Sequence, residues 1–183
     1  MRSRICLKNL QKRLELTEQQ KFTLIKKLDN LEIRKYQKCT MATVEINAGY
    51  EEATNLGFRP LVTYISQNNI AMTAPVLQQK TKSDSFLVSF VMPEEMKLSD
   101  LPNSQNLNIS LHEVAEYFAA VITFKGFATK QKVNEKEIEL RKLIDKHHLN
   151  ATGEVLVARF DPPWKPGFLR HNEVILHLNN FNI

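Results

Sequence analysis

Five histidines are the side chains of this sequence best suited to metal or acid–base chemistry. They are His112, His147, His148, His171 and His177. None is paired at a metal-binding spacing such as HExxH, and His147 and His148 close a predicted helix, where a cation suits the helix dipole. His171 lies instead in the loop "WKPGFLRHNEV", which also carries aromatic and cationic residues. We therefore single out His171 for testing, with an ordinary surface histidine as the alternative.

Nucleophilic and carboxylate chemistry has less support in the sequence. No GxSxG elbow occurs, and nothing places a base beside Cys39. Glu51 and Glu52 of a predicted helix could form a carboxylate cluster with Glu173, although solvated helix charges are the usual explanation. We expect no enzyme, and we keep a hydrolase with Glu52 or Glu173 as its base as a remote alternative.

Apolar and cationic residues occur together in two segments. Phe58, Arg59 and Val62 lie on a predicted helix, and a second group lies before the last predicted strand, namely Trp164, Phe168, Arg170 and His171. A flat apolar ligand with carboxylates would suit aromatic and aliphatic walls with cations at the rim. From the residues alone, core packing and ordinary surface charge explain the same pattern better.

The composition limits the classes of protein to which this chain can belong. A chain of 183 residues with 43% hydrophobic and 25% charged residues can bury a core without disulfides. The two cysteines, Cys6 and Cys39, fit no metal or redox spacing, which suggests a reducing compartment. No apolar run approaches the ~18 residues of a membrane span. We therefore expect a cytoplasmic protein without a membrane span.

The positive charge is concentrated at the amino terminus. Residues 1–38 hold 11 Lys and Arg against 4 Asp and Glu, whereas the remaining residues carry a net charge of −2. Residues 1–20 are predicted to be a basic extension whose leucine spacing allows a short amphipathic helix. Such an extension could touch nucleic acid or an acidic membrane surface. Since no nucleic-acid-binding motif accompanies it, a solvated tail or helix is the simpler interpretation.

The rest of the chain alternates strand and helix patterns. Residues 21–46 are predicted to form two strands joined by a turn at Asp29-Asn30, and residues 49–69 a helix that Pro60 should kink or split. Strands are predicted at 69–79 and 85–93, with Pro75 at a strand end, edge or bulge. A strand, or a pair hinged near Glu113, follows at 107–124. A helix at 129–148 and strands at 153–163 and 173–178 complete the order.

This order predicts two consecutive β-α-β-β repeats, at about 22–92 and 98–178. The stretches "INAGYEEA" and "TFKGFATK" echo each other at the two strand-to-helix junctions. Prolines are also predicted to end the first strand after each helix, at Pro75 and at Pro162-Pro163. About eight antiparallel strands and two helices favour an α+β fold with a curved, barrel-like sheet that the helices cover.

Two stretches resemble a known family. "GFRPLVTYISQNNIAMTAPV" and "ARFDPPWKPGFLRHNEVILHL" closely resemble the two signature regions of the SOUL heme-binding protein family. "LEIRKY" and "FKGFATKQK" look like two further segments of it, and the resemblance covers roughly residues 22–178. It implies a distorted, eight-stranded antiparallel β-barrel made of two β-α-β-β repeats and flanked by two helices. That architecture is similar to the gyrase-inhibitor-like effector-binding domains.

The resemblance also implies a function. Residues 21–183 would form a domain that binds heme or a related tetrapyrrole non-covalently in an apolar surface cleft and acts as carrier or buffer. A promiscuous effector-binding domain for flat apolar ligands is the alternative. The site implied by the family maps onto two segments of this chain, and its residues are Asn55, Phe58, Arg59, Val62, Trp164, Phe168, Arg170 and His171.

The sequence departs from the family pattern at the residues proposed to bind the heme iron and its carboxylates. A histidine proposed as iron ligand in part of the family is Lys35 here, and Arg59 is the only cation on the first helix. His171 remains the candidate iron ligand, and Met72 is predicted to be core despite its place in the signature. We expect a monomer that binds a tetrapyrrole and no nucleic acid.

Overall fold

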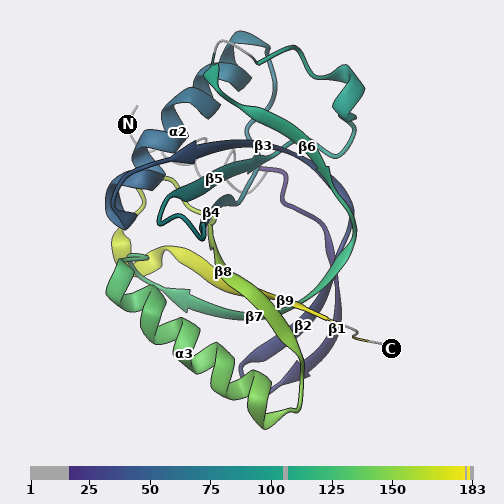
Figure 1. Cartoon of the computed structure of the whole chain (residues 1–183), viewed down its shortest axis with the longest axis vertical. Helices are drawn as coiled ribbons and strands as arrows, with labels where there is room; N and C mark the ends of the chain where they lie inside the picture. Colours follow the sequence, from purple (N-terminus) through teal and green to yellow (C-terminus); the bar gives the residue numbers. More distant parts are fainter. Residues whose placement is uncertain (1–16, 105–106, 180, 182–183) are drawn as a thin grey trace, which may run out of the picture.

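The computed structural model describes residues 17–104, 107–179 and 181 of the chain (Figure 1). Within them, nine strands and two α-helices follow one another. Their order is β1 (Phe22–Leu28), β2 (Leu31–Tyr36), β3 (Cys39–Ile46), α2 (Tyr50–Gln67), β4 (Val76–Lys80), β5 (Phe86–Val91), β6 (Ser110–Val114), β7 (Tyr117–Lys125), α3 (Lys130–Lys146), β8 (Ala151–Arg159) and β9 (His171–Leu178). Short 3-10 helices, η1 (Leu98–Asp100) and η3 (Gly167–Leu169), lie in loops. The helix allowed for residues 1–20 falls almost entirely outside the described residues.

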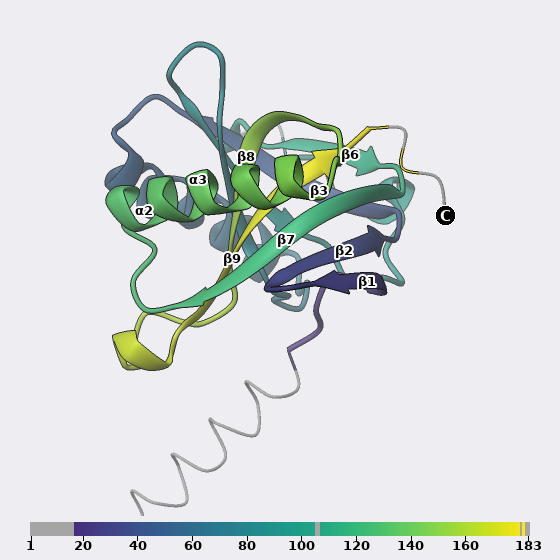
Figure 2. The same cartoon turned by 90° about the horizontal axis from the view of Figure 1, so that it is seen from below.

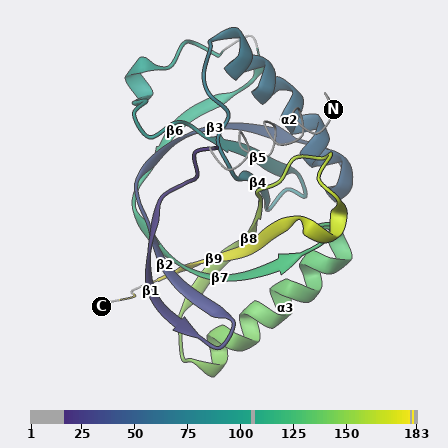
Figure 3. The same cartoon turned by 180° about the vertical axis from the view of Figure 1, so that it is seen from behind.

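All nine strands form one antiparallel sheet, which confirms the predicted α+β class. The strand order is β1-β2-β7-β9-β8-β4-β5-β3-β6. Counted outward from the central β8–β4 pair, one side of the sheet has the order β8, β9, β7, β2, and the other side has the order β4, β5, β3, β6. Strands at equal distances from the centre correspond to each other, so the two sides of the sheet are arranged symmetrically. Figures 1 and 3 show the strands bending round a common centre with both helices on the outer side. Closure of this sheet into a barrel stays a prediction, because the order ends at β1 and β6.

The sheet has an outer face under the helices and an inner face towards its centre. Each helix covers its own outer core: Leu140 and Ile144 of α3 pack on one, and Leu61 and Ile65 of α2 on the other. Alternate residues point inward and form a third cluster, which contains Tyr36, Met41, Leu77, Val91, Ala119, Val121, Ala158 and Ile175. Because side chains alternate along a strand, the same strands supply both faces.

Glycine at position 57 lets α2 lie close to the sheet. A Cβ on Gly57 would lie 2.6 Å from Cβ of Val88 in β5, a separation that real Cβ atoms do not show. Pro60 also lies inside α2, yet the helix runs without interruption from Tyr50 to Gln67. The predicted split is therefore wrong. α3 begins with a side-chain cap, since Thr129 accepts a hydrogen bond from the Lys132 amide at 3.2 Å.

The predicted number of strands was too small. Residues 31–46 form two strands rather than one, because the chain breaks at the exposed Gln37 and Lys38 and changes neighbours. β2 pairs with β1 and β7, whereas β3 pairs with β5 and β6. The predicted hinge near Glu113 is present, since β6 ends at Val114 and β7 begins at Tyr117.

The stretch "MTAP" is not part of a regular strand. β4 begins only at Val76, after a cis peptide bond between Ala74 and Pro75. The Ala74 amide donates to the Glu18 carbonyl at 2.8 Å, and the Ala74 carbonyl accepts from the Gln20 amide at 3.1 Å. The Thr73 hydroxyl donates to the Val91 carbonyl. This stretch therefore fastens residues 18–20 across the end of the sheet.

Two expectations about this stretch were wrong. Pro75 precedes β4, whereas Pro162 and Pro163 follow β8, so these prolines do not occupy equivalent places in the two halves. Met72 is 38% exposed and is not a core residue.

Candidate functional site

The α2 members of the predicted site divide between surface and core. Asn55 and Arg59 are exposed, whereas Phe58 and Val62 are partly buried. Phe58 packs edge-on against Phe90 of β5 with ring centroids 5.3 Å apart, and Val62 packs against the same outer core. Of these four residues, Asn55 and Arg59 are therefore the two that a ligand can reach without disturbing the core.

The loop members are presented on a fixed segment between β8 and β9. Trp164 is 66% exposed and Phe168 is 75% exposed. The loop is held by internal contacts, because the Lys165 ammonium lies 2.6 Å from the Asp161 carboxylate and the Arg170 Nε donates to the Lys165 carbonyl at 2.9 Å. The two aromatic rings are thus held out into solvent by a loop with its own hydrogen bonds.

Phe127 joins this loop, and the sequence reasoning missed it. Its ring lies under the Arg170 guanidinium, 4.8 Å from the ring centroid, and is itself 60% exposed. A Cβ on Gly167 would overlap Cε2 of this ring, so a larger residue there would require the exposed ring to shift. The Gly126 amide donates to the Arg170 carbonyl at 3.1 Å. The signal was present in the stretch "FKGFATKQK", which was noted only as a strand-to-helix junction.

His171 begins β9 and turns its ring towards the inner face. Its Nε2 lies 3.0 Å from Oε1 of Glu173, and its ring meets Phe160 edge-on at 4.7 Å. The His171 amide donates to the Asp161 carboxylate at 2.5 Å. The ring nitrogen that would reach a metal most freely is therefore already engaged by a buried carboxylate.

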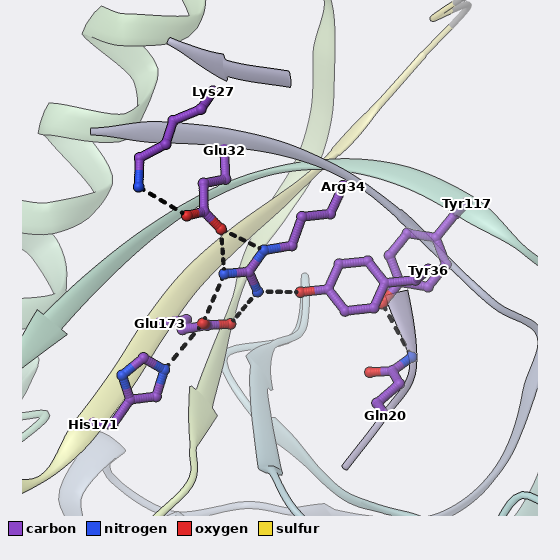
Figure 4. Close-up of polar contacts among 8 residues, drawn as sticks. All are labelled: Gln20, Lys27, Glu32, Arg34, Tyr36, Tyr117, His171 and Glu173. Atoms are coloured by element: carbon purple, nitrogen blue, oxygen red, sulfur yellow. Dashed lines mark hydrogen bonds and ion pairs between the residues drawn. The ribbon is translucent and has the colours of Figure 1, made fainter. Parts of the chain in front are cut away.

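Glu173 lies at the centre of a polar network that the sequence did not reveal (Figure 4). Arg34 of β2 donates to both of its carboxylate oxygens, at 2.9 and 3.0 Å. Arg34 also donates to Glu32 at 2.7 and 2.9 Å and to the Tyr36 hydroxyl at 3.1 Å. A carboxylate so fully paired is a poor general base, which weakens the hydrolase alternative for Glu173.

The network shifts the titration of its members. Burial alone would lower the pKa of the Arg34 guanidinium, but the hydrogen bond and charge of Glu173 hold that pKa above its ordinary value. Burial beside Glu173 raises the pKa of the Tyr36 hydroxyl. Burial likewise raises the pKa of the Tyr117 hydroxyl. Both phenols are therefore neutral hydrogen-bonding groups at physiological pH.

The start of α2 and the loop with η3 both adjoin the connection between β7 and α3. In this connection, Ala128 accepts from the Tyr50 hydroxyl of α2 at 3.1 Å and Gly126 donates to the loop. Figure 2 shows the loop with η3 projecting beyond the sheet, on the other side of this connection from α2. The joint use of α2 and the loop by one ligand stays a prediction.

A cavity of about 340 Å³ opens on the inner face, and none of the predicted site residues lines it. Its walls combine aliphatic side chains, such as Met41 and Leu87, with His112, His177 and Tyr117. The rings of His177 and Tyr117 stack at 4.2 Å, and Tyr117 stacks on Tyr36 at 5.0 Å. Burial lowers the pKa of His177, so this wall is aromatic and uncharged at neutral pH.

A second cavity, of about 650 Å³, lies where residues 18–21 cross the sheet. Gln20 is buried there, and its amide nitrogen lies 3.5 Å from both Cys39 Sγ and the Tyr117 hydroxyl. Burial raises the pKa of the Cys39 thiol to about 11, so this cysteine is a neutral thiol and an unsuitable nucleophile. Within the described part of the chain, no group of three or more His, Cys, Asp or Glu residues could hold a metal ion.

Comparison with known proteins identifies relatives at the level of family and fold. A family model described as SOUL heme-binding protein matches residues 17–177. A search of curated protein sequences found no match. Among solved structures, the EcmrR C-terminal domain superposes with a TM-score of 0.66 at 11% identity, over 81% of this chain and 96% of that one.

Two proteins from Listeria innocua are also similar. An uncharacterized conserved protein has a TM-score of 0.59 at 10% identity, over 82% of this chain and 92% of that one. A protein described as a hydrolase has a TM-score of 0.56 at 12% identity, over 85% and 94%. At such identities the likeness shows a shared fold and carries no activity. No helix among the described residues is long and apolar enough to cross a membrane.

Proposed function

The chain belongs to the SOUL heme-binding protein family, and on that premise we propose that it binds heme or a related tetrapyrrole non-covalently and acts as a carrier or buffer. The proposed site is an open face rather than a deep cavity. It comprises the loop residues Trp164, Phe168 and Arg170 with Phe127 beside them, and the exposed α2 residues Asn55 and Arg59.

The single observation that supports this site is the pair of exposed aromatic rings on a fastened loop. Trp164 and Phe168 are 66% and 75% exposed, and a flat macrocycle offers the apolar surface that would cover them. Cations suit the carboxylates of such a ligand. Arg59 is exposed and forms no ion pair with any residue that the structure describes, so its guanidinium is available for a carboxylate.

Iron ligation is a separate element of the proposal. At the position where part of the family has a proposed histidine ligand, Lys35 forms an ion pair with Glu116 at 2.8 Å. His171 is the remaining candidate, and ligation through Nε2 would replace its 3.0 Å contact with Glu173. Since that exchange leaves the buried Glu173 with fewer partners, we expect weak or absent ligation. Metal-free protoporphyrin should then bind about as well as hemin.

The proposal is tested by titrating the full-length protein with hemin and with protoporphyrin IX while following the Soret band and Trp164 fluorescence. Both ligands should saturate near one equivalent and quench the chain's single tryptophan. Saturation by neither ligand would refute the proposal. A carrier or buffer should also release hemin to an excess of apomyoglobin, and retention of the ligand would argue against that role.

Variants locate the site. Arg59→Glu should weaken binding several-fold by reversing a charge at the rim. Lys142→Glu provides the matched control, since Lys142 is also exposed but lies on α3. An equal effect of the two substitutions would remove α2 from the site. His171→Ala should leave the hemin spectrum nearly unchanged, whereas a changed Soret band would establish His171 as the iron ligand.

A second candidate function is favoured by the cavity on the inner face. Its volume of about 340 Å³ and its wall of stacked His177 and Tyr117 suit a small aromatic molecule, as an effector-binding domain would require. Leu87→Trp should fill this cavity and abolish binding of a dye such as ethidium without affecting hemin. Dye binding that survives Leu87→Trp, or that is lost with Phe168→Ser, would exclude the cavity as its site.

A further inference from the structure

The three most exposed large apolar side chains of the described residues lie in and beside the loop with η3, which projects beyond the sheet in Figure 2. We define the loop patch as Phe127, Trp164, Phe168 and Leu169. Their exposed fractions are 60%, 66%, 75% and 49%. Contiguous apolar side chains on a surface mark an interaction site more often than scattered ones do. The patch is therefore a candidate docking surface, and it shares Phe127, Trp164 and Phe168 with the face proposed for the tetrapyrrole.

The patch is built to stay exposed. The Leu169 amide donates to the Pro166 carbonyl at 2.9 Å and the Arg170 amide to the Gly167 carbonyl at 3.0 Å. The Arg170 side chain is held from below by the Lys165 and Pro163 carbonyls. With its backbone fixed in this way, the loop cannot fold its rings back into the core without losing these hydrogen bonds.

Cations surround the patch. Lys125 ends β7 opposite His171, and Lys130 begins α3 three residues after Phe127. Both are exposed. Asp161 pairs with Lys165 at 2.6 Å, whereas the Glu51 carboxylate accepts from the Lys130 backbone amide at 2.9 Å and keeps its negative charge. Lys125, Lys130 and Arg170 together outnumber this one carboxylate. The patch is therefore apolar at its tip and positively charged at its rim.

We propose that the loop patch inserts into the interfacial region of an anionic lipid bilayer and holds the protein peripherally on its surface. Tryptophan and phenylalanine prefer that region, and flanking Lys and Arg are attracted to acidic headgroups. The tip offers roughly 400 Å² of apolar area if each of the three rings contributes on the order of 120 Å² and Leu169 adds a smaller share. A stable protein partner needs about 800 Å² per side, and no patch residue lines either cavity described above.

The experiment uses the full-length protein and its single tryptophan, which lies in the patch. Large unilamellar vesicles of phosphatidylcholine, with and without 30% phosphatidylserine, are added while flotation and Trp164 emission are followed. Vesicles with phosphatidylserine should bind the protein and shift the emission to shorter wavelength. Pure phosphatidylcholine should bind at least ~fivefold more weakly, because each nearby cation adds about 1 kcal/mol on an anionic surface.

Two variants isolate the patch. The double substitution Phe168→Ser/Leu169→Ser should lower vesicle partitioning by about tenfold or more, since it removes two of the four apolar anchors. Ile138→Ser is the matched control, because Ile138 is 56% exposed but lies on α3. It should bind as the unaltered protein does.

Several results would overturn the inference. Flotation without a Trp164 shift, unaffected by the double substitution, would assign binding to another basic region. A concentration-dependent dimer that dissociates in the double variant would assign the patch to a second copy of the chain. The inference does not depend on tetrapyrrole binding. Hemin titration without vesicles tests that function separately, so either proposal can fail while the other stands.

Discussion

Arg34→Met should be among the most damaging single substitutions in this domain. The side chains of Arg34 and Glu173 are only 5% and 3% exposed, and two hydrogen bonds of 2.9 and 3.0 Å join them. Removing one partner of a buried ion pair leaves an uncompensated charge and costs ~3–5 kcal/mol. Since a domain is stable by only ~5–15 kcal/mol in total, this loss is a large part of the free energy of unfolding.

The reciprocal substitution should cost less, and the structure gives the reason. Glu173→Gln leaves Arg34 paired with Glu32 at 2.7 Å, so the guanidinium keeps a carboxylate. Arg34→Met leaves Glu173 with His171 alone, whose side chain is 44% exposed. We expect roughly 1–3 kcal/mol for Glu173→Gln. The double substitution Arg34→Met/Glu173→Leu should recover much of the loss, because it leaves no buried charge.

Urea unfolding followed by far-UV circular dichroism measures these differences. Tryptophan fluorescence is unsuitable, because Trp164 is 66% exposed already in the folded state. With a slope of about 2 kcal/mol/M, Arg34→Met should lower the midpoint by ~1.5–2.5 M. A loss below ~1 kcal/mol, or a Glu173→Gln variant less stable than Arg34→Met, would refute this account of the network.

Three further predictions concern packing, pH and reactivity. Gly57→Ala should destabilise the protein by ~1–3 kcal/mol, because the new Cβ would lie 2.6 Å from Val88. Calorimetry should find no such loss for Gly49→Ala, where the space is open. Adding Val88→Ala to Gly57→Ala should restore part of the lost stability. Burial lowers the pKa of His177 below its ordinary 6.5, so the unfolded chain takes up the proton more readily than the folded protein. The free energy of unfolding should therefore fall as the pH drops below about 6.5. His177→Phe should flatten this fall between pH 7.5 and 5.5, and an unchanged pH profile would contradict the prediction. In a Cys6→Ser background, Cys39 should react slowly with iodoacetamide at pH 8, since its thiol pKa is about 11; a rate equal to that of free cysteine would show the site to be open.

The local pattern of the sequence predicted most of the secondary structure. The helix at residues 129–148 and the paired strands around Asp29-Asn30 were recognisable from periodicity and turn residues, and they are present as α3 and as β1 with β2. Errors arose where tertiary contacts override local preference. Pro60 lies within an unbroken α2, and the break at Gln37 is set by the exchange of neighbouring strands.

The candidate site was only partly predictable for a similar reason. Trp164, Phe168 and Arg170 are neighbours in sequence, so one loop motif identified them together. Phe127 was missed, because its contact with Gly167 joins segments 40 residues apart. Phe58 was assigned to the site through the family resemblance, but its side chain packs against Phe90 on the buried side of α2.

By itself, the sequence determined most of the order of elements, the two-fold repetition of strand and helix, and the family, because these are written in short patterns of residue type. Only the tertiary structure decided the pairing of Arg34 with Glu173, which are 139 residues apart, the role of "MTAP" in fastening residues 18–20, and the exposure of the loop patch. Such features depend on which segments meet across a curved sheet. These segments come together because all the apolar faces of the chain must be buried in the same fold. No single stretch of the sequence contains that information.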